Sequence, residues 1–291
     1  MGDFTYLLIS GLSLGSLYAL MALGLVIVYG ILRLVNFAYG EYIMVAGYTL
    51  FLLSPSPLPW LVMAVVAAVM AAVMSYLTER IAFRPVREKS LTAMLITSFA
   101  VSTLLQNAAL LFVSPRARVV PTPGIFSETV IIAGNVTPVR EILAIVVSVA
   151  LLIGFSILLR KTILGIALRA AADKFTMTRM LGVPANLVIS AAFVISGLLA
   201  GIVAIFWLGR TGSVTPGIGL TPLLVAFVST VIGGMRSLSG AVVGGYVLAF
   251  VTIIFNNLLP GDLYEFREAF IFTIVILILL FRPEGLVRGR G

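Results

Sequence analysis

The stretch LLISGLSLGSLYALMALGLVIVYGIL, residues 7–32, carries no charged side chain over its whole length. A helix needs about 20 apolar residues to cross a bilayer, so this stretch is long enough to span one. It lacks a basic segment in front and a small-residue cleavage site, and it is longer than the apolar core of a signal peptide, so we expect a permanent span. Similar apolar runs recur to the end of the chain, and they predict an integral membrane protein.

Composition supports the same class, because 61% of the 291 residues are hydrophobic and only 10% are charged, whereas a soluble domain carries about 25% charged residues. Dividing the chain at charged residues and Pro/Gly breaks yields nine apolar segments, at 7–32, 41–53, 59–78, 91–113, 139–159, 186–209, 218–235, 240–259 and 267–281. The second is short and the seventh is interrupted, so either is a full span, a half-helix or a re-entrant element. We predict an all-α polytopic membrane protein with about 8–9 transmembrane or partly re-entrant helices, forming a single transmembrane domain over residues 1–291.

The net charge of +8 is compatible with nucleic-acid binding in a soluble protein, but in a membrane protein it is expected from basic cytoplasmic loops. Alternating nine spans places the N-terminus outside and the C-terminus in the cytoplasm. Fourteen of the 19 Lys and Arg residues then lie on the cytoplasmic side and five outside, which satisfies the positive-inside rule. The longest external loop, 114–138, is either a plain loop or a flap over a pathway.

Several kinds of chemistry are excluded by the residue types present. The chain has no Cys and no His, which rules out disulfides, thiol nucleophiles and imidazole proton relays. The dipeptide Gly-Lys is absent, so a GxxxxGK[ST] phosphate loop is absent too. The eleven acidic residues are scattered, and the interiors of the long apolar segments carry no charge. We therefore expect no enzymatic activity, no metal and no cofactor, and any transport takes its energy from elsewhere.

Polar residues at the edges of the apolar segments are candidates for a pathway, since burial of polar groups in lipid is costly unless they line a cavity or have partners. Asn36 follows the end of the first segment, and Glu41 begins the second. Glu41 at a helix start either interacts with the helix dipole or shapes the inner end of a path. In the fourth segment, a polar stripe forms either a hydrogen-bonded seam or a cavity wall. The candidate path residues are Asn36, Glu41, Ser98, Ser102 and Asn107, with Gln106 or Thr103 extending the stripe.

A charged, alanine-rich stretch interrupts the apolar pattern at residues 164–188, on the predicted cytoplasmic side. We expect a helix over about 165–182, ended by Gly182 in a left-handed cap and by Pro184. One helical face then holds Leu168, Ala171, Phe175 and Thr178, and the opposite face holds Arg169, Asp173, Thr176, Met177 and Met180. Exposed Met beside charged residues favours contact with a protein over contact with lipid or an unstructured basic loop.

Small residues four positions apart are the remaining pattern, at Gly11 and Gly15, Gly197 and Gly201, and Gly240 and Gly244. Such pairs allow helix backbones to approach closely in lipid. We expect them to mark tight helix packing.

Taken together, these stretches resemble the LivH/LivM family, the membrane permease subunits of branched-chain amino-acid ABC importers, and the LivH type in particular. The resemblance is carried by GLSLGSLYALMALGLVIVYGILRLVNFAYGEYIMVAGY (11–48), RPVR (84–87), LLQNAALLF (104–112), GIALRAAADKFTMTRMLGVPANLVISAAFVISGLLAGIVA (165–204), VIGGMRSLSGAVVGGYVLAF (231–250) and LLFRPEGL (279–286). Tyr39 stands where the family usually has His, which leaves any role of that position open. The resemblance implies a multi-pass protein of the bacterial inner membrane that works by alternating access.

The same resemblance implies partners: a second homologous permease subunit, two cytoplasmic ATPase subunits that hydrolyse the ATP, and an extracytoplasmic substrate-binding protein. It also implies that the 165–182 helix is a coupling helix seated on an ATPase, with Arg169, Ala170, Asp173, Met180 and Gly182 in the matching motif. Related permeases carry urea, short amides or other amino acids. A self-sufficient channel or secondary carrier is the alternative from another class.

Overall fold

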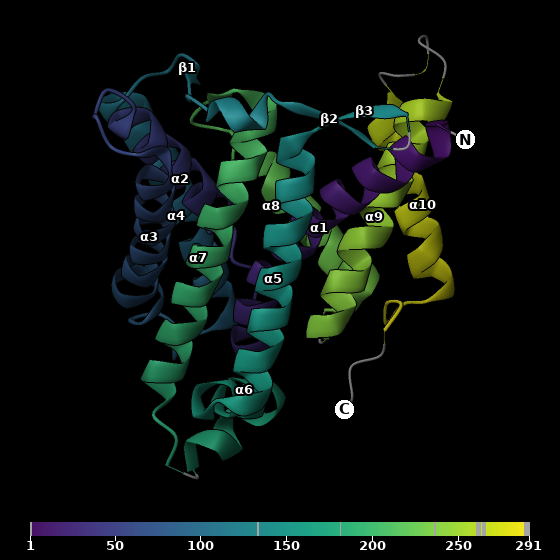
Figure 1. Ribbon diagram of the computed structural model, residues 1–291. Helices are drawn as coiled ribbons and strands as arrows, with labels where there is room; N and C mark the ends of the chain where they lie inside the picture. Colours follow the sequence, from purple (N-terminus) through teal and green to yellow (C-terminus); the bar gives the residue numbers. More distant parts are fainter. Residues whose placement is uncertain are drawn as a thin grey trace. The chain divides into compact units, whose positions relative to one another are not determined.

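The computed structural model describes residues 2–132, 134–180, 182–235, 237–259, 263 and 266–287, without the side chains of 2–6, 173–176, 179 and 185. Its helices are α1 (Gly2–Leu32), α2 (Tyr39–Leu53), α3 (Trp60–Leu77), a π-helix η1 (Thr78–Phe83), α4 (Leu91–Phe112), a 3₁₀ turn η2 (Gly124–Phe126), α5 (Val139–Lys161), α6 (Ile163–Met180), α7 (Ala185–Thr211), α8 (Leu220–Gly233), α9 (Leu238–Leu258) and α10 (Arg267–Phe281). Figure 1 shows the chain as almost wholly helical. The predicted all-α class is confirmed.

Each of the nine predicted apolar segments is a helix in the structure. Six helices in the described residues are long and apolar enough to cross a membrane, namely α1, α3 with η1, α4, α5, α7 and α9. The other three, α2, α8 and α10, have 15, 14 and 15 residues. At 1.5 Å per residue they extend about 21–23 Å, less than the ~30 Å hydrocarbon core. Helices of this length suit the half-helix interpretation of the second and seventh segments.

The chain divides into two compact units. One unit contains residues 1–26, 124–151 and 225–291, and the other contains residues 27–123 and 152–224. Helices α1, α5 and α8 each pass from one unit into the other. All of the candidate site residues belong to the second unit.

Small residues hold the second unit together where α3 packs on α7. A Cβ atom added at Gly197 would lie 2.6 Å from the Ala71 carbonyl oxygen, and one added at Gly201 would lie 2.6 Å from the Ala68 Cα. Ser75 donates a hydrogen bond across this seam to the Phe193 carbonyl at 2.7 Å. The prediction that the 197/201 pair marks close backbone approach is confirmed, with alanines on α3 supplying the matching surface.

The first unit uses the other glycine pairs in the same way. Gly11 and Gly15 on α1 lie directly against the rings of Phe250 and Tyr246 on α9. Gly244 faces the carbonyl of Ser229 on α8 so closely that no Cβ fits between them. A side chain at any of these glycines would push neighbouring helices apart.

The predicted external loop 114–138 contains three short strands and the 3₁₀ turn η2. In the second unit, β1 (Arg118–Val119) pairs with β4 (Ser213–Val214), which follows α7. In the first unit, β2 (Thr129–Ile132) and β3 (Asn135–Pro138) form an antiparallel hairpin. The first strand of the hairpin ends at Ile132, and Ala133 lies outside the described residues.

Candidate functional site

A buried hydrogen-bond cluster surrounds Glu41 at the start of α2. Glu41 is only 2% exposed. Its Oε1 accepts hydrogen bonds from the Ser102 hydroxyl at 2.9 Å and from the Gln106 side-chain amide at 2.7 Å, both on α4. The i, i+4 spacing places these two residues on one face of α4. Hydrogen bonds from two donors lower the cost of burying the carboxylate in an apolar unit.

Asn36 shapes the entry into the same helix. It is 3% exposed, and its Oδ1 accepts a hydrogen bond from the Ala38 backbone N–H while its Nδ2 donates to the Tyr42 hydroxyl, each at 3.1 Å. This side-chain turn substitutes for backbone hydrogen bonds before α2 begins. Asn36 thus connects the end of α1 to the first turn of α2.

The other two residues of the predicted path are arranged differently. Ser98 is fully buried one turn before Ser102, and its hydroxyl donates to the Leu95 carbonyl of its own helix. Asn107 is exposed and its side-chain amide donates to the Thr103 carbonyl. The structure therefore brings Glu41, Ser102 and Gln106 together, with Ser98 on the same side of α4. Asn36 lies instead against Tyr42 of α2, and Asn107 is exposed.

The beginnings of the two short helices α2 and α8 meet within this region. A Cβ added at Gly40 would collide with the Gly219 carbonyl, and one added at Gly219 would collide with the Gly40 backbone. Gly40 is in the first turn of α2, and Gly219 immediately precedes α8. Two helix N-termini thus lie side by side, and the helix dipole gives each a partial positive charge. Part of their first-turn N–H groups is already paired, since the Glu41 N–H donates to the Ala38 carbonyl and the Leu220 N–H to the Gly217 carbonyl.

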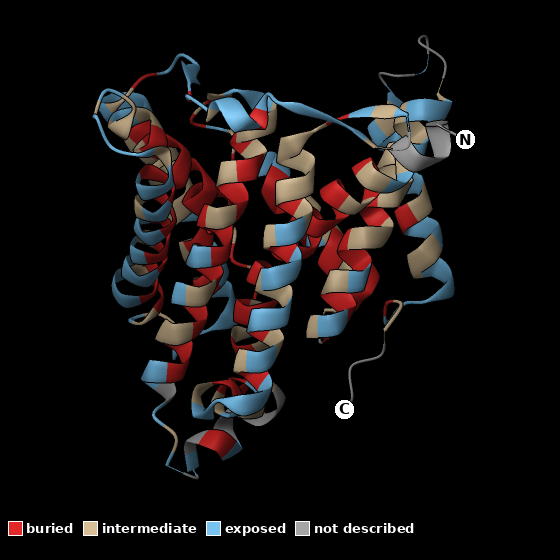
Figure 2. Cartoon of the chain, in the orientation of Figure 1, coloured by how far each residue is buried: buried red, intermediate tan, exposed pale blue. Residues whose placement is uncertain are grey.

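The predicted charged helix is present as α6, with the two faces that the sequence indicates. Leu168, Ala171 and Thr178 are buried, whereas Arg169 is exposed and Met177 and Met180 are 59% and 77% exposed. Ala170 is half-buried. Figure 2 shows α6 with both buried and exposed stretches. Asp173 lies within α6, but its side chain is outside the described residues, as are those of Phe175 and Thr176.

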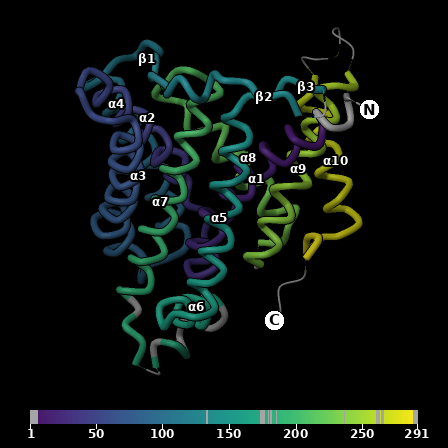
Figure 3. The backbone as a smooth tube through the Cα atoms, in the orientation of Figure 1, coloured from purple at the N-terminus to yellow at the C-terminus, as the bar shows by residue number. Residues whose placement is uncertain are grey.

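Specific contacts hold α6 at both of its ends. At the start, the Thr162 hydroxyl accepts from the Gly165 N–H at 3.0 Å, and Gly165 lies against the backbone of the last turns of α5. At the end, Gly182 has φ +85°, and the Val183 N–H reaches the Thr178 carbonyl at 3.4 Å. This is the expected left-handed helix end. Figure 3 shows α6 as a separate helix that turns away from the direction of α5.

Arg33, just after α1, binds the middle of α6. Its Nη2 donates to the Ala172 carbonyl at 2.7 Å. Arg33 has φ 55°, a left-handed conformation that few side chains adopt. The packing around it must therefore offset some backbone strain.

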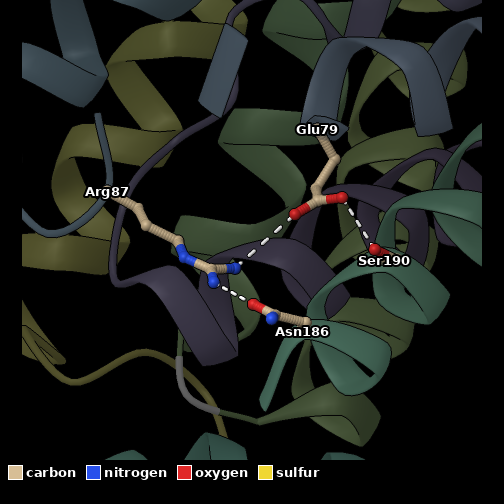
Figure 4. Close-up of polar contacts among 4 residues, drawn as sticks. All are labelled: Glu79, Arg87, Asn186 and Ser190. Atoms are coloured by element: carbon tan, nitrogen blue, oxygen red, sulfur yellow. Dashed lines mark hydrogen bonds and ion pairs between the residues drawn. The ribbon is translucent and has the colours of Figure 1, made fainter. Parts of the chain in front are cut away.

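A second buried charge cluster joins the start of α7 to the α3–α4 connection, and Figure 4 shows its four residues. Glu79 in η1 is fully buried; its Oε1 lies 3.6 Å from the Arg87 Nη1, and its Oε2 accepts from the Ser190 hydroxyl at 2.7 Å. Arg87 also donates to the Asn186 side-chain oxygen. Ser190 and Asn186 lie on one face of α7, four residues apart.

In the sequence, Arg87 stands out only as a basic residue within the RPVR stretch (84–87), and nothing singles out Glu79. Glu79 follows an apolar segment that we expected to end at residue 78, whereas the helix continues as a π-helix to Phe83. More than a hundred positions separate Glu79 from Ser190, so no local spacing indicates the pairing. The only signal of this ion pair in the sequence is that an acidic residue, Glu79, and a basic residue, Arg87, both lie in the short connection between two apolar segments.

A cleft of about 600 Å³ opens beside this cluster. Its lining comes from the end of α1, the 87–91 connection with Met94, and the 183–189 segment around the α6–α7 link. The end of the predicted cytoplasmic segment 80–89 therefore lies close to residues 183–189, which directly follow the other predicted cytoplasmic segment, 160–182. Their proximity agrees with a common side of the membrane.

Comparison with known proteins identifies the family. Residues 7–280 match the family model described as "Branched-chain amino acid transport system / permease component". The chain is 35% identical to the high-affinity branched-chain amino acid transport system permease protein BraD of Pseudomonas aeruginosa, over 97% of this chain and 95% of the relative. It is 31% identical to the permease protein LivH of the corresponding system of Escherichia coli K12, over 99% and 96%. A probable LivH of Methanocaldococcus jannaschii is 26% identical over 93% and 88%.

Six helices able to span a membrane and this full-length similarity make the chain a multi-pass protein of the bacterial inner membrane. The resemblance noted in the sequence is confirmed. The chain belongs to the family of permease components of branched-chain amino acid transport systems.

Proposed function

We propose that this chain is a membrane subunit of an ATP-driven importer for leucine, isoleucine and valine, and that it forms part of the translocation path by alternating access. The observation that carries the proposal is similarity over nearly the whole chain to permease proteins whose names specify branched-chain amino acid transport. Cargo release then requires two conformations that differ by only a few kcal/mol, so that ATP-driven partners can shift the equilibrium.

In this proposal, ATP is hydrolysed by two separate cytoplasmic subunits that bind α6. The support is the exposure of Met177 and Met180 next to exposed Arg169. Flexible apolar side chains with a charged neighbour are typical of a protein contact surface. Arg169, Ala170, Asp173, Met180 and Gly182 are the proposed coupling residues, with Gly182 acting through the helix end rather than by contact.

Movement of α6 would reach the membrane helices through α7 and the Glu79 cluster. The α6–α7 link is short, and α7 is tied at Asn186 and Ser190 to Arg87 and Glu79. A push on α6 would therefore displace the start of α7 together with η1. Packed helices with charged hydrogen bonds transmit such displacements as rigid bodies.

The proposed path residues are Asn36, Glu41, Ser98, Ser102 and Asn107. Glu41 bonds to Ser102, and Ser98 lies one turn before Ser102 on α4. Asn36 lies against Tyr42 of α2, and Asn107 would contribute only from its exposed position. The remaining proposed partners are a second homologous permease subunit and an extracytoplasmic substrate-binding protein that delivers the cargo.

Reconstitution into proteoliposomes tests the proposal. The chain with a LivM-type permease subunit, two ATPases and a binding protein is expected to accumulate leucine only when ATP is enclosed in the vesicles and the binding protein is outside. Leucine flux through the chain alone, without ATPase or ATP, would show a self-sufficient channel or carrier and overturn the proposal. Accumulation of urea or acetamide in place of leucine would retain the importer class and replace the cargo.

A further inference from the structure

The two carboxylate oxygens of Glu41 have different surroundings. Oε1 accepts two hydrogen bonds from α4, at 2.9 and 2.7 Å. Oε2 is buried and has no hydrogen-bond partner among the residues that the structure describes. A buried carboxylate oxygen without a donor is costly, and such atoms in native proteins usually have a partner. The free oxygen is therefore a site for a cationic hydrogen-bond donor.

Whereas Oε2 of Glu41 favours a cation, the N-termini of α2 and α8 beside it favour an anion. Glu41 is the third residue of α2, so it lies within the same first turn as Gly40, which touches Gly219 before α8. Unpaired N–H groups and the dipole make a helix N-terminus attractive to anions. In transporters, short helices that begin inside the protein direct their N-termini at anionic groups of the cargo. A negative oxygen thus lies within one helical turn of two partly positive helix ends.

This pairing of charges is complementary to an α-amino acid, which carries an ammonium and a carboxylate on one carbon. We propose that Glu41 Oε2 binds the α-ammonium group of the cargo while the N-terminus of α8 faces its carboxylate. The inference rests on the proposed function for the presence of an amino acid in this subunit. Because Glu41 is 2% exposed, the cargo reaches it only in a conformation that opens the packing on the Oε2 side while α4 still binds Oε1.

The experiment compares Glu41→Gln with Glu41→Asp in the complete reconstituted importer, with leucine as cargo. Gln keeps the size of the side chain and an oxygen for Ser102 and Gln106, but it cannot pair with an ammonium. We expect E41Q to assemble and to unfold at the wild-type temperature. Its maximal leucine uptake should fall at least about tenfold, the effect of losing one charge-assisted hydrogen bond. E41D should retain an intermediate rate.

Two control variants separate this role from packing. Ser102→Ala removes a donor to Oε1 and leaves Oε2 intact, so uptake should stay within about threefold of wild type. Leu104→Ala changes a side chain of the same helix that is 67% exposed and has no proposed role, and it should have no effect. Wild-type uptake by E41Q in an assembled complex would overturn the inference and leave the proposed function standing. No leucine uptake by the wild-type complex would instead refute the proposed function.

Two further measurements identify the cation that Oε2 of Glu41 binds. Replacing sodium by choline should leave uptake unchanged, and a sodium requirement that disappears in E41Q would assign the oxygen to an inorganic cation and overturn the inference. Millimolar leucinamide inside the vesicles, which keeps the ammonium, should inhibit uptake, whereas 4-methylvalerate, which lacks it, should not. Failure of leucinamide to inhibit, or equal inhibition by both compounds, would overturn the inference even if E41Q did not fold.

Discussion

The region around Glu41 and the helix α6 differ in which side chains are buried. Polar groups are buried around Glu41, whereas apolar side chains are exposed on α6. Glu41 and Asn36 are 2% and 3% exposed and make hydrogen bonds to side chains of neighbouring helices. In α6, by contrast, apolar Met177 and Met180 are exposed beside Arg169. The buried polar group needs partners because it has left water, whereas the exposed methionines gain by burial against another protein. The difference separates a region suited to cargo from a region suited to a partner subunit.

The largest effect should come from the contact between α2 and α8. Gly219→Val would place a branched side chain into the Gly40 backbone. No side-chain rotation relieves this clash, because it involves the Cβ atom itself and the backbone of the neighbouring helix. We expect loss of folded protein in the membrane, measured as monodisperse yield after detergent extraction. Gly217→Ala is the matched control, because a Cβ there meets no atom within 4 Å. Equal yields of the two variants would contradict the role assigned to this contact.

The next largest effect should come from breaking the Glu79 cluster, which lies between the two compared regions. Arg87→Met leaves Glu79 buried without its cation, and the free energy of unfolding should fall by about 3 kcal/mol, as for other broken buried ion pairs. Glu79→Gln together with Arg87→Met removes both charges and should recover part of that loss. The measurement is thermal unfolding of the purified subunit. A double variant less stable than either single variant would contradict the pairing.

Association with the ATPases tests the α6 side of the comparison. Met180→Glu puts a charge into the proposed contact and should weaken ATPase association at least about tenfold, or ~1.4 kcal/mol, measured by co-purification at graded ATPase concentrations. Asp173→Lys should act in the same direction. Membrane insertion should be unchanged, because Met180 is 77% exposed.

Ile163→Glu is the control for that prediction. Ile163 is 88% exposed at the other end of α6, about 25 Å from Met180 along the helix. Equal weakening by the charge at either end would show that the docking surface is not centred on the methionines.

The smallest effect should come from the helix end at Gly182. Gly182→Ala places a Cβ on a residue with φ +85°, which costs about 1 kcal/mol although no atom lies within 4 Å of the added carbon. We expect a small fall in thermal stability with ATPase association within about fivefold of wild type. A loss of association as large as that of Met180→Glu would mean that Gly182 itself contacts the partner.

Much of the fold could be read from the sequence because lipid imposes a simple rule on it. Apolar runs bounded by charges or by Pro and Gly predicted nine helices, and the structure has a helix at each of them. The helix period also predicted both faces of α6 and the common side of Ser102 and Gln106. These inferences depend on residues that are near one another along the chain, for which geometry follows from spacing.

Pairings across the fold could not be read in this way. The sequence marked Glu41 as a candidate and Gln106 as part of a stripe, but only the packing of α2 on α4 joins them. It left Glu79 unmarked, since its partners come from a connection and from a helix more than a hundred residues away. It also placed Asn107 with the path residues, whereas the rotation of α4 turns it outward.

The amino-acid sequence by itself determined the membrane class, the helices and the separate character of the 163–180 helix, because hydropathy and helical period are local properties. Only the tertiary structure decided which polar groups meet. Whether a buried oxygen is satisfied depends on which distant helix faces it, and that is set by how closely backbones approach at positions such as Gly40 and Gly219. For the same reason, the unpartnered Oε2 of Glu41 is visible only in the folded protein.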